Sequence, residues 1–339
     1  MSLFANPSME QIAPEELRAL QEKRLQKQLR WAAEKSAHYR EAFAERGMNG
    51  QSLKELKETG ALQALPLLSA ADFAGRKSFD FLTMPLSSLL RISQMRVASG
   101  EGEPFVHFAT NGDIAHRIEL VTRSLVACGL HNASLAAVLG DGADSRIMDV
   151  HYALEFIGAA TMMLGTEPER WAEQMDLVTP ETLIGTPERL LALDDALLQR
   201  GSGLSELPLS RIIFLHESAP GAELAASLQA MTSARVYHML ALPELGTAAL
   251  FLPCEPGELA FHLQEDFVLG EVIDPQTGEP AETAGELVLT TLLAEAMPLV
   301  RLRTGLYVEP IPAPCTCGRS MRRFRLVLPL GSLSRCCIL

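Results

Sequence analysis

The sequence has 339 residues, of which 47% are hydrophobic and 21% are charged, and a chain of this length and composition buries a sizeable core without disulfides. Its net charge of −13 at pH 7 disfavours nucleic acids and anionic membrane surfaces as partners, since both are bound through a basic face. The sequence contains no apolar run long enough to span a bilayer and no signal peptide, so we expect a cytoplasmic protein.

Residues 1–90 are predicted to form a helical N-terminal segment. Within it, residues 14–46 are expected to form one helix, because Leu25, Leu29 and Ala32 follow one another along one face and make an apolar stripe. We interpret the basic residues of this helix as its solvated face rather than as a binding patch. These residues are Lys23, Arg24, Lys27 and Arg30.

A second segment, residues 91–246, alternates short β-rich runs with amphipathic helices. Asp113 is suited to cap a helix that ends at Gly129. Apolar runs are predicted as strands at 134–139, 158–164, 183–185, 211–215 and 235–239. Because strands that alternate with helices form parallel sheets, we predict an α/β fold with a mainly parallel sheet covered by helices on both faces.

A third segment, residues 247–328, lacks the helical pattern, and residues 329–339 are interpreted as a tail. Strands are predicted at 259–262, 267–273 and 286–291. Residues 274–278, with the sequence DPQTG, are predicted as a turn because Pro and Gly favour the backbone dihedral angles of turns. The segment is therefore expected to be a small antiparallel β region.

Several stretches between residues 14 and 328 carry the pattern of one enzyme family. The longest runs from EVIDPQTGEP to PLVRLRT, residues 271–304. The others lie at 38–43, 151–159, 185–187 and 315–319. Taken together, they resemble the phenylacetate–CoA ligase group of the adenylate-forming enzymes over almost the whole chain.

This resemblance implies the N-terminal domain of an adenylate-forming enzyme, with mainly parallel sheets flanked by helices and a small antiparallel β region. Enzymes of the group use ATP and magnesium to convert an acyl or aryl carboxylate into an acyl-adenylate, and they then transfer the acyl group to coenzyme A. A mobile C-terminal domain with an essential lysine completes their site. The residues after 328 do not match that domain, so we expect it to be absent.

The resemblance places the phosphate-binding loop of the family at residues 99–104. Ser99, Gly100 and Gly102 match it and are the predicted nucleotide-binding remnants, whereas Glu103 stands at the position of the family's lysine. A triphosphate requires hydrogen-bond donors and positive charge, so this carboxylate opposes ATP binding. The other interpretation of the stretch is an ordinary glycine-containing turn.

A second motif of the family provides a tyrosine beside the adenine, a hydroxyl residue and a glutamate that helps to bind magnesium. The matching positions are Leu240, Pro243 and Glu244, and Leu and Pro side chains offer no hydrogen bond to a nucleotide. Glu244, the candidate catalytic residue, is therefore either a remaining metal ligand or a helix-cap carboxylate.

A third motif ends in an aspartate that binds the ribose hydroxyls, and this position is Leu306. The preceding Arg303 and Thr304 are retained, either as nucleotide-binding remnants or as anchors of a strand. A fourth motif supplies small residues beside the adenine, and its counterpart begins with His216, whose side chain crowds a base. A lone His is more often a hydrogen-bonded structural residue than a catalytic one.

The acyl pocket of the family is aromatic and glycine-rich, whereas this sequence has charged residues at the matching positions. Two interpretations are open, a solvent-facing loop and a polar pocket for a basic ligand. The residues are Asp141, Asp144, Arg146 and Asp149.

These mismatches predict a degenerate, phenylacetate–CoA ligase-like protein without full ATP-dependent ligase activity, which acts by binding a small acyl or nucleotide-like ligand or a protein partner. The alternative is an active aryl- or acyl-CoA ligase that uses ATP, Mg²⁺ and CoA, with an altered site or a C-terminal domain supplied by another chain. A third interpretation is a purely structural subunit. A homodimer is expected only by analogy with the family.

Four residues retain the chemistry of a zinc site, namely Cys254, His262, Cys315 and Cys317. Three thiolates and one imidazole suit tetrahedral Zn²⁺ in a closed structural site, and the resemblance implies the same four residues in relatives. The other interpretation is a set of small buried residues without metal. We predict a structural zinc ion.

Overall fold

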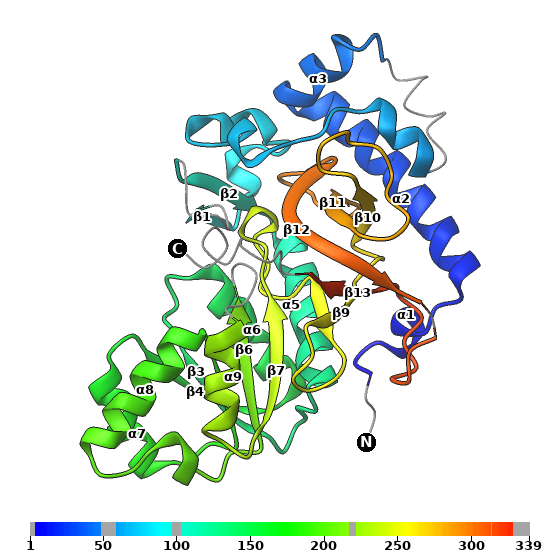
Figure 1. The fold of residues 1–339 in the computed structure, drawn as a ribbon. Helices are drawn as coiled ribbons and strands as arrows, with labels where there is room; N and C mark the ends of the chain where they lie inside the picture. The colour runs from blue at the N-terminus through cyan, green and yellow to red at the C-terminus, as the bar shows by residue number, and fades with distance from the viewer. Residues whose placement is uncertain (1–3, 49–58, 97–102, 217–221, 313, 328–339) are drawn as a thin grey trace.

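The computed structural model describes residues 4–48, 59–96, 103–216, 222–312 and 314–327, and it divides into two lobes built around two sheets (Figure 1). One lobe holds a five-stranded parallel sheet in the order β4-β3-β5-β6-β7. Its strands are β3 (Leu135–Leu139), β4 (Ala160–Gly165), β5 (Thr182–Gly185), β6 (Arg211–His216) and β7 (Arg235–Leu240). The predicted α/β fold with a parallel sheet is confirmed.

Helices cover both faces of the parallel sheet, and two separate apolar clusters fill the space between helices and strands. On one face lie α5 (Asn111–Ala127) and α6 (Ser145–Ile157). On the other face lie α7 (Pro168–Leu177), α8 (Pro187–Gln199) and α9 (Ala222–Ala230). Thr110 begins α5 with a capping box, in which Thr110 and Asp113 bond to each other's backbone N–H groups.

The second lobe holds a six-stranded antiparallel sheet in the order β10-β11-β12-β13-β9-β8. Its strands are β8 (Phe251–Pro253), β9 (Ala260–Leu263), β10 (Val268–Ile273), β11 (Gly285–Thr291), β12 (Leu302–Ile311) and β13 (Arg323–Leu326). The predicted turn at 274–278 joins β10 to β11. The Asp274 carboxylate accepts hydrogen bonds from the backbone N–H groups of Gln276 and Thr277 at 2.8 and 3.0 Å, and Gly278 has a positive φ of 75°.

The N-terminal segment is not one helix between 14 and 46, as predicted, but two. The first, α2 (Pro14–Lys35), ends at Ser36, whose backbone is extended with ψ of 135°. The Ser36 hydroxyl accepts from the backbone N–H of Tyr39 and donates to the carbonyl of Asp80 at 2.8 Å. Because this hydroxyl caps a new helix, α3 (Ala37–Ala44), the chain turns there instead of continuing.

The remaining elements are short. They are α1 (Pro7–Glu10), the two-stranded antiparallel pair β1 (Arg91–Met95) and β2 (Phe105–Ala109), and the 3₁₀ helices η1 (Thr59–Ala64), η2 (Ala70–Asp72), η3 (Arg76–Phe81), η4 (Leu86–Ser88), η5 (Leu204–Glu206) and η6 (Pro243–Leu245).

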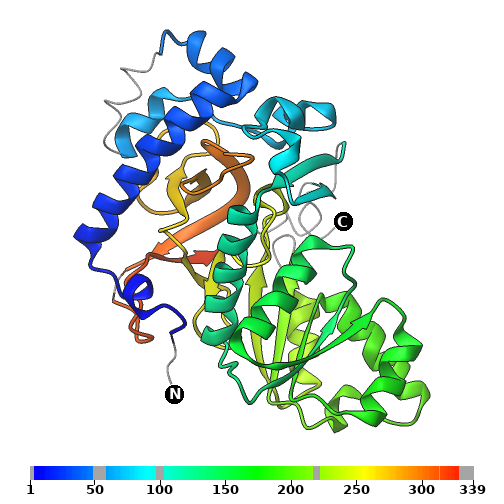
Figure 2. The ribbon, with the colours of Figure 1, turned by 180° about the vertical axis from the view of Figure 1, so that it is seen from behind.

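Seen from behind, α2 runs along the outside of the antiparallel lobe, and α5 lies between the two sheets (Figure 2). A side-chain amide forms a hydrogen bond between each of these two helices and the antiparallel lobe. Gln28 donates to the carbonyl of Ala294 at 2.8 Å, and Gln264 donates to the carbonyl of Leu120 in α5 at 3.1 Å. Among the helices of the described part of the chain, none is both long and apolar enough to cross a membrane.

Candidate functional site

The four predicted metal ligands come together in the antiparallel lobe. Cys254 follows β8, His262 lies in β9, and Cys315 and Cys317 lie in the connection between β12 and β13. Pairing of β13 with β9 sets Arg323 opposite His262. This pairing brings the connection that carries Cys315 and Cys317 close to His262 and Cys254. The ligand atoms of all four residues lie within 4.8 Å of one another.

The donor geometry fits a tetrahedral ion. The Sγ atoms of Cys254 and Cys315 are 3.3 Å apart, as are Cys317 Sγ and His262 Nε2. Zn–S bonds of about 2.3 Å place two sulfurs of a tetrahedral zinc about 3.8 Å apart, so only a small outward movement would admit the ion. The Cys254 thiol forms a hydrogen bond with the sulfur of Cys317. This hydrogen bond holds the pKa of Cys317 well below its ordinary value, and His262 acts in the same direction.

The His262 ring is oriented for ligation by a contact behind it. Its Nδ1 lies 2.7 Å from the carbonyl oxygen of Met321. A carbonyl only accepts, so the proton resides on Nδ1 and the lone pair of Nε2 faces the three sulfurs. This is the arrangement in which a backbone carbonyl fixes the tautomer of a metal-binding imidazole.

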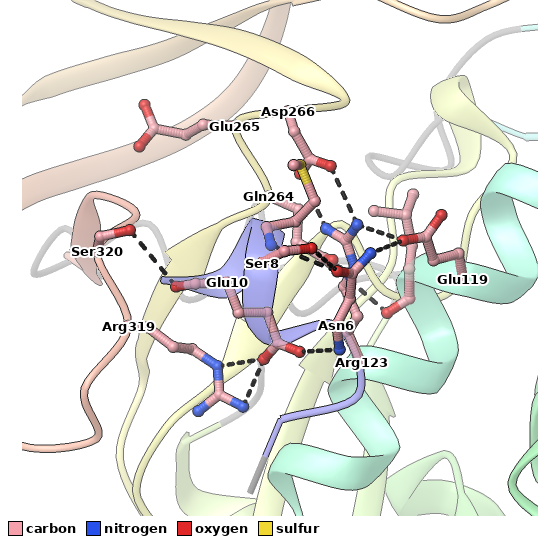
Figure 3. Close-up of polar contacts among 12 residues, drawn as sticks. Asn6, Ser8, Glu10, Glu119, Arg123, Gln264, Glu265, Asp266, Arg319 and Ser320 are labelled. Carbon is pink, nitrogen blue, oxygen red and sulfur yellow. Dashed lines mark hydrogen bonds and ion pairs between the residues drawn. The ribbon is translucent and has the colours of Figure 1, made fainter. Parts of the chain in front are cut away.

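The cysteine-bearing loop is held by a buried ion pair with the N-terminal helix (Figure 3). Gly318 adopts a positive φ of 81°, and its N–H donates to the carbonyl of Cys315 at 3.1 Å. The next residue, Arg319, donates from Nε and Nη2 to Glu10 Oε2 at 2.8 Å, and both side chains are almost fully buried. The loop is therefore anchored to α1.

A second buried ion pair continues this network into the other lobe (Figure 3). Arg123 of α5 donates to both carboxylate oxygens of Asp266, at 2.9 and 3.1 Å, and also bonds to Glu119. Asn6 joins the two pairs, because its side chain donates to Glu119 and its backbone N–H donates to Glu10, each at 2.8 Å. Sequence reasoning missed this network, since its partners are as many as 309 residues apart and no local pattern connects them.

The position predicted to crowd an adenine is filled by a pair of histidines. His216, at the end of β6, stacks on His238 of β7 with ring centroids 5.1 Å apart, and His216 Nε2 lies 2.9 Å from His238 Nδ1. Burial lowers the pKa of His216 to about 3 and that of His238 to about 4, so both rings are neutral. The structural interpretation of His216 agrees with this geometry.

The other replaced nucleotide positions are buried in apolar surroundings. Leu240 lies opposite His216 in the register of β6 and β7. Leu240 is 2% exposed, Leu306 is 5% exposed, and both belong to the apolar cluster of the antiparallel lobe. Pro243 and Glu244 lie in η6 directly after β7 and are buried as well.

Arg303 and Thr304 anchor β12 to its neighbouring strand. Arg303 donates to the Glu286 carboxylate at 2.9 and 2.5 Å, and this bonding raises the pKa of Arg303. Thr304 donates to the carbonyl of Leu287 at 2.6 Å. These contacts correspond to one of the two interpretations of Arg303 and Thr304, that of residues that anchor a strand.

The predicted phosphate-loop residues Ser99, Gly100 and Gly102 lie outside the described residues. Glu103 is described, and its carboxylate lies against Gly75. A Cβ atom at that glycine would come within 2.6 Å of Glu103 Oε2.

The charged residues expected at the acyl pocket divide into two groups. Asp141, Asp144 and Arg146 line a cleft of about 500 Å³ at the carboxyl ends of the parallel strands, where Arg146 pairs with Asp144 at 2.8 Å. Asp149 is fully buried in α6 and pairs with Arg91 at 2.6 Å. A solvent-facing loop is therefore wrong for Asp149, and the other three line a polar cleft.

Two curated relatives match nearly the whole chain. The chain is 30% identical over 320 residues to the phenylacetate–coenzyme A ligase of Aromatoleum evansii, and the aligned region covers 93% of this chain and 70% of that protein. It is 29% identical over 336 residues to the phenylacetate–coenzyme A ligase of Thermus thermophilus, and the aligned region covers 96% of this chain and 73% of that protein.

Solved structures show the same fold. A crystal structure of 2-hydroxyisobutyryl-CoA ligase in complex with 2-HIB-AMP and CoA matches with a TM-score of 0.83 at 19% identity, over 95% of this chain and 69% of that one. The chain matches no protein-family model. On the strength of its similarity to the two curated enzymes, the chain belongs to the phenylacetate–coenzyme A ligase family.

Proposed function

We propose that this member of the family lacks full ATP-dependent ligase activity and acts by binding a small acyl or nucleotide-like ligand or a protein partner. The observation that carries the proposal is the burial of Leu240 and Leu306 in one apolar cluster, beside the neutral pair His216–His238. These are the positions at which the family resemblance calls for groups that bind adenine and ribose.

The energetics of that cluster oppose a nucleotide. Seating a ribose at Leu306 would require a leucine to leave a packed core, which costs about 2–5 kcal/mol when its side chain is simply removed. The site would then offer the ribose hydroxyls no carboxylate, and an unsatisfied buried hydroxyl costs about 1–3 kcal/mol. Glu103 adds negative charge where a triphosphate needs a cation.

A structural zinc ion fits the same proposal, because the antiparallel lobe retains its ligands while the nucleotide positions have changed. Cys254, His262, Cys315 and Cys317 would hold the ion. When bound, it would cross-link the β8–β9 and β12–β13 connections and stabilise the lobe that carries Leu306.

The test measures adenylate formation and ligand binding on the purified chain. Pyrophosphate release is followed with ATP, Mg²⁺ and phenylacetate, and melting temperature is followed with ATP–Mg²⁺, AMP, phenylacetate and CoA. The Thermus thermophilus enzyme serves as the positive control. We expect no carboxylate-dependent pyrophosphate release and no shift with ATP–Mg²⁺, whereas a ligand at 100 times its Kd stabilises a protein by about 2.7 kcal/mol. Carboxylate-dependent pyrophosphate release would overturn the proposal.

One observation favours the second candidate, an active ligase with an altered site. Glu244, which matches the magnesium-binding glutamate, is retained and lies in η6, after β7. This candidate predicts that the C-terminal domain of a relative, added as a separate polypeptide, produces acyl-CoA from ATP, CoA and a carboxylate. Glu244→Gln should abolish that activity.

A further inference from the structure

Two of the clustered cysteines present their sulfur atoms to each other. Cys254 Sγ and Cys315 Sγ are 3.3 Å apart, whereas Cys317 Sγ lies at the same distance from His262 Nε2. Within the described residues every cysteine is a free thiol. A disulfide bond requires about 2.05 Å between its sulfurs, so the sulfurs of Cys254 and Cys315 are already close to bonding distance.

These two sulfurs belong to separate connections that touch beside them. Cys254 directly follows β8, and Cys315 lies 61 residues later, between β12 and β13. The hydroxyl of Thr316 donates to the carboxylate of Glu255 at 3.3 Å, which ties the two connections together next to the cysteines. The approach of the sulfurs therefore requires only local movement of these connections.

The loop that carries Cys315 is held in place by contacts that do not involve its sulfur atoms. Arg319 forms the buried ion pair with Glu10, and the backbone N–H of Ser320 donates to the Glu10 carbonyl at 3.1 Å. Figure 3 shows that Arg319 and Ser320 approach Glu10 from the same loop. Because this anchor is independent of any metal, it keeps Cys315 beside Cys254 when the metal is lost.

The cluster is open to a small oxidant. Cys254, Cys315 and Cys317 are half-buried, and the neighbouring Thr316 and Gly318 are exposed. The oxidation of cysteines follows their exposure, so a peroxide should reach all three sulfurs of the cluster.

Cys128 provides an internal contrast to the cluster. Its side chain is 0% exposed, and burial raises the pKa of its thiol. A buried thiol in apolar surroundings is inert, so the same oxidant should leave Cys128 unmodified.

From these contacts we infer that Cys254 and Cys315 are a redox modification site, at which a peroxide forms a reversible disulfide bond that replaces zinc as the link between the two connections. This inference deepens the zinc proposal and rests on it for the release of metal. Zinc is bound by thiolates in a site that needs all four ligands, so the disulfide and the bound ion exclude each other. A disulfide in a reducing compartment is usually transient and redox-sensing.

Hydrogen peroxide supplies the oxidising equivalents. One of the two sulfurs, as its thiolate, attacks a peroxide oxygen and breaks the O–O bond, which gives a sulfenic acid and, with one proton, water. The other thiol then attacks the sulfenic sulfur, forms the S–S bond and releases the sulfenic oxygen as a second water. The two thiols lose two electrons in total to the peroxide, and an added dithiol returns them.

The test treats the full, zinc-containing chain with hydrogen peroxide. Intact mass and peptide mapping detect the disulfide, and a chromogenic chelator detects released zinc. Cys336 and Cys337 are replaced by Ser in every sample, so that they contribute no other disulfide. We expect a loss of two hydrogen atoms, a bond between Cys254 and Cys315, and release of about one zinc per chain. Dithiothreitol with added zinc should reverse all three changes.

Two substitutions separate the disulfide from general oxidative damage. Cys315→Ser retains Cys317 but should form no bond to Cys254, whereas the matched control Cys128→Ser should behave as the wild type. Oxidised, metal-free wild type should melt at a higher temperature than reduced protein stripped by a chelator, because a disulfide restricts the unfolded chain. Cys315→Ser should show no such gain.

A disulfide between Cys254 and Cys317, or oxidation that stops at irreversible sulfinic acid, would overturn the inference. So would a Cys254–Cys315 disulfide that leaves zinc bound. The zinc proposal fails separately, because protein purified without zinc would refute it while the mass measurement still reports the disulfide. Zinc-containing protein that forms no disulfide would refute the redox site alone.

Discussion

The imidazole rings of His216 and His238 stack at an interplanar angle of 21°, with 2.9 Å between Nε2 of the first and Nδ1 of the second. His216 ends β6, His238 lies within the adjacent parallel strand β7, and both are almost fully buried. One of the two facing nitrogens carries the shared proton and the other accepts it. Protonation of the accepting nitrogen therefore breaks the hydrogen bond, and protonation of both rings places two cations side by side.

Acidification should therefore destabilise the protein through this pair. The folded-state pKa values are depressed from 6.5 to about 3 for His216 and about 4 for His238. Between these values and pH 6.5 the unfolded chain binds more protons than the folded one, so stability is fully present above about pH 6.5 and declines as the pH falls toward 4. Each ring contributes at most about 1.4 kcal/mol per pH unit.

The variant His216→Asn isolates this effect. Its free energy of unfolding, measured in urea at several values between pH 7.5 and 4.5, should depend less steeply on pH than that of the wild type. His131→Asn, at a partly exposed loop residue, is the matched control and should preserve the wild-type slope. An unchanged slope in His216→Asn would contradict the assignment.

Strands with a clear local pattern of apolar residues were predicted from the sequence. Strands and contacts that depend on distant partners were not. The run Arg211–His216 is β-branched and apolar, so its burial in a parallel sheet followed from its pattern. By contrast, β12 contains Arg303, Gly305 and Pro310, which obscure any alternation, and it is defined by its pairing with β11 and β13. Pattern alone does not identify such a strand.

The candidate site shows the same division. Cys315 and Cys317 are close in sequence and have a recognisable chemistry, so their grouping with Cys254 and His262 was predictable. The pairing of Arg319 with Glu10 was not, because nothing near either residue indicates the other. Lys23 and Lys27 are exposed, as the interpretation of a solvated helix face expects. The groove that they line together with residues 292–295 was not predictable, because it depends on a segment distant in sequence.

The zinc proposal predicts about one zinc ion per chain, measured by plasma emission spectrometry on protein purified without added metal. Cys254→Ser and Cys317→Ser should each lose the ion and lower the melting temperature, because a tetrahedral site with three ligands no longer closes around zinc. Cys128→Ser is the control, since Cys128 is buried outside the cluster and should leave the metal content unchanged. Metal-free wild-type protein, with Cys254→Ser equally stable, would refute the site.

The pair between Glu10 and Arg319 should be important for both stability and metal retention. Their side chains are 0% and 2% exposed, and removing one partner of a buried pair costs about 3–5 kcal/mol because the other charge remains buried. Glu10→Gln should lower the free energy of unfolding by this order and speed the loss of zinc to a chelator, since the cysteine loop loses its anchor. Glu309→Gln breaks the exposed pair with Arg325, and its effect should be about 0–1 kcal/mol. Equal effects of the two substitutions would show that the buried pair does not hold the loop.

Restoring the family's aspartate at Leu306 tests whether the nucleotide site can be regained by one change. Leu306 is 5% exposed within an apolar cluster, so Leu306→Asp should bury a carboxylate and destabilise the protein by about 3 kcal/mol or more, without producing binding of ATP or AMP. Leu306→Asn, of similar size but uncharged, separates charge from shape. Burial raises the pKa of a carboxyl group, so the stability difference between the two variants should shrink as the pH falls from 7.5 toward 5. A stable Leu306→Asp protein that binds ATP would show that the apolar cluster is not the barrier to nucleotide binding.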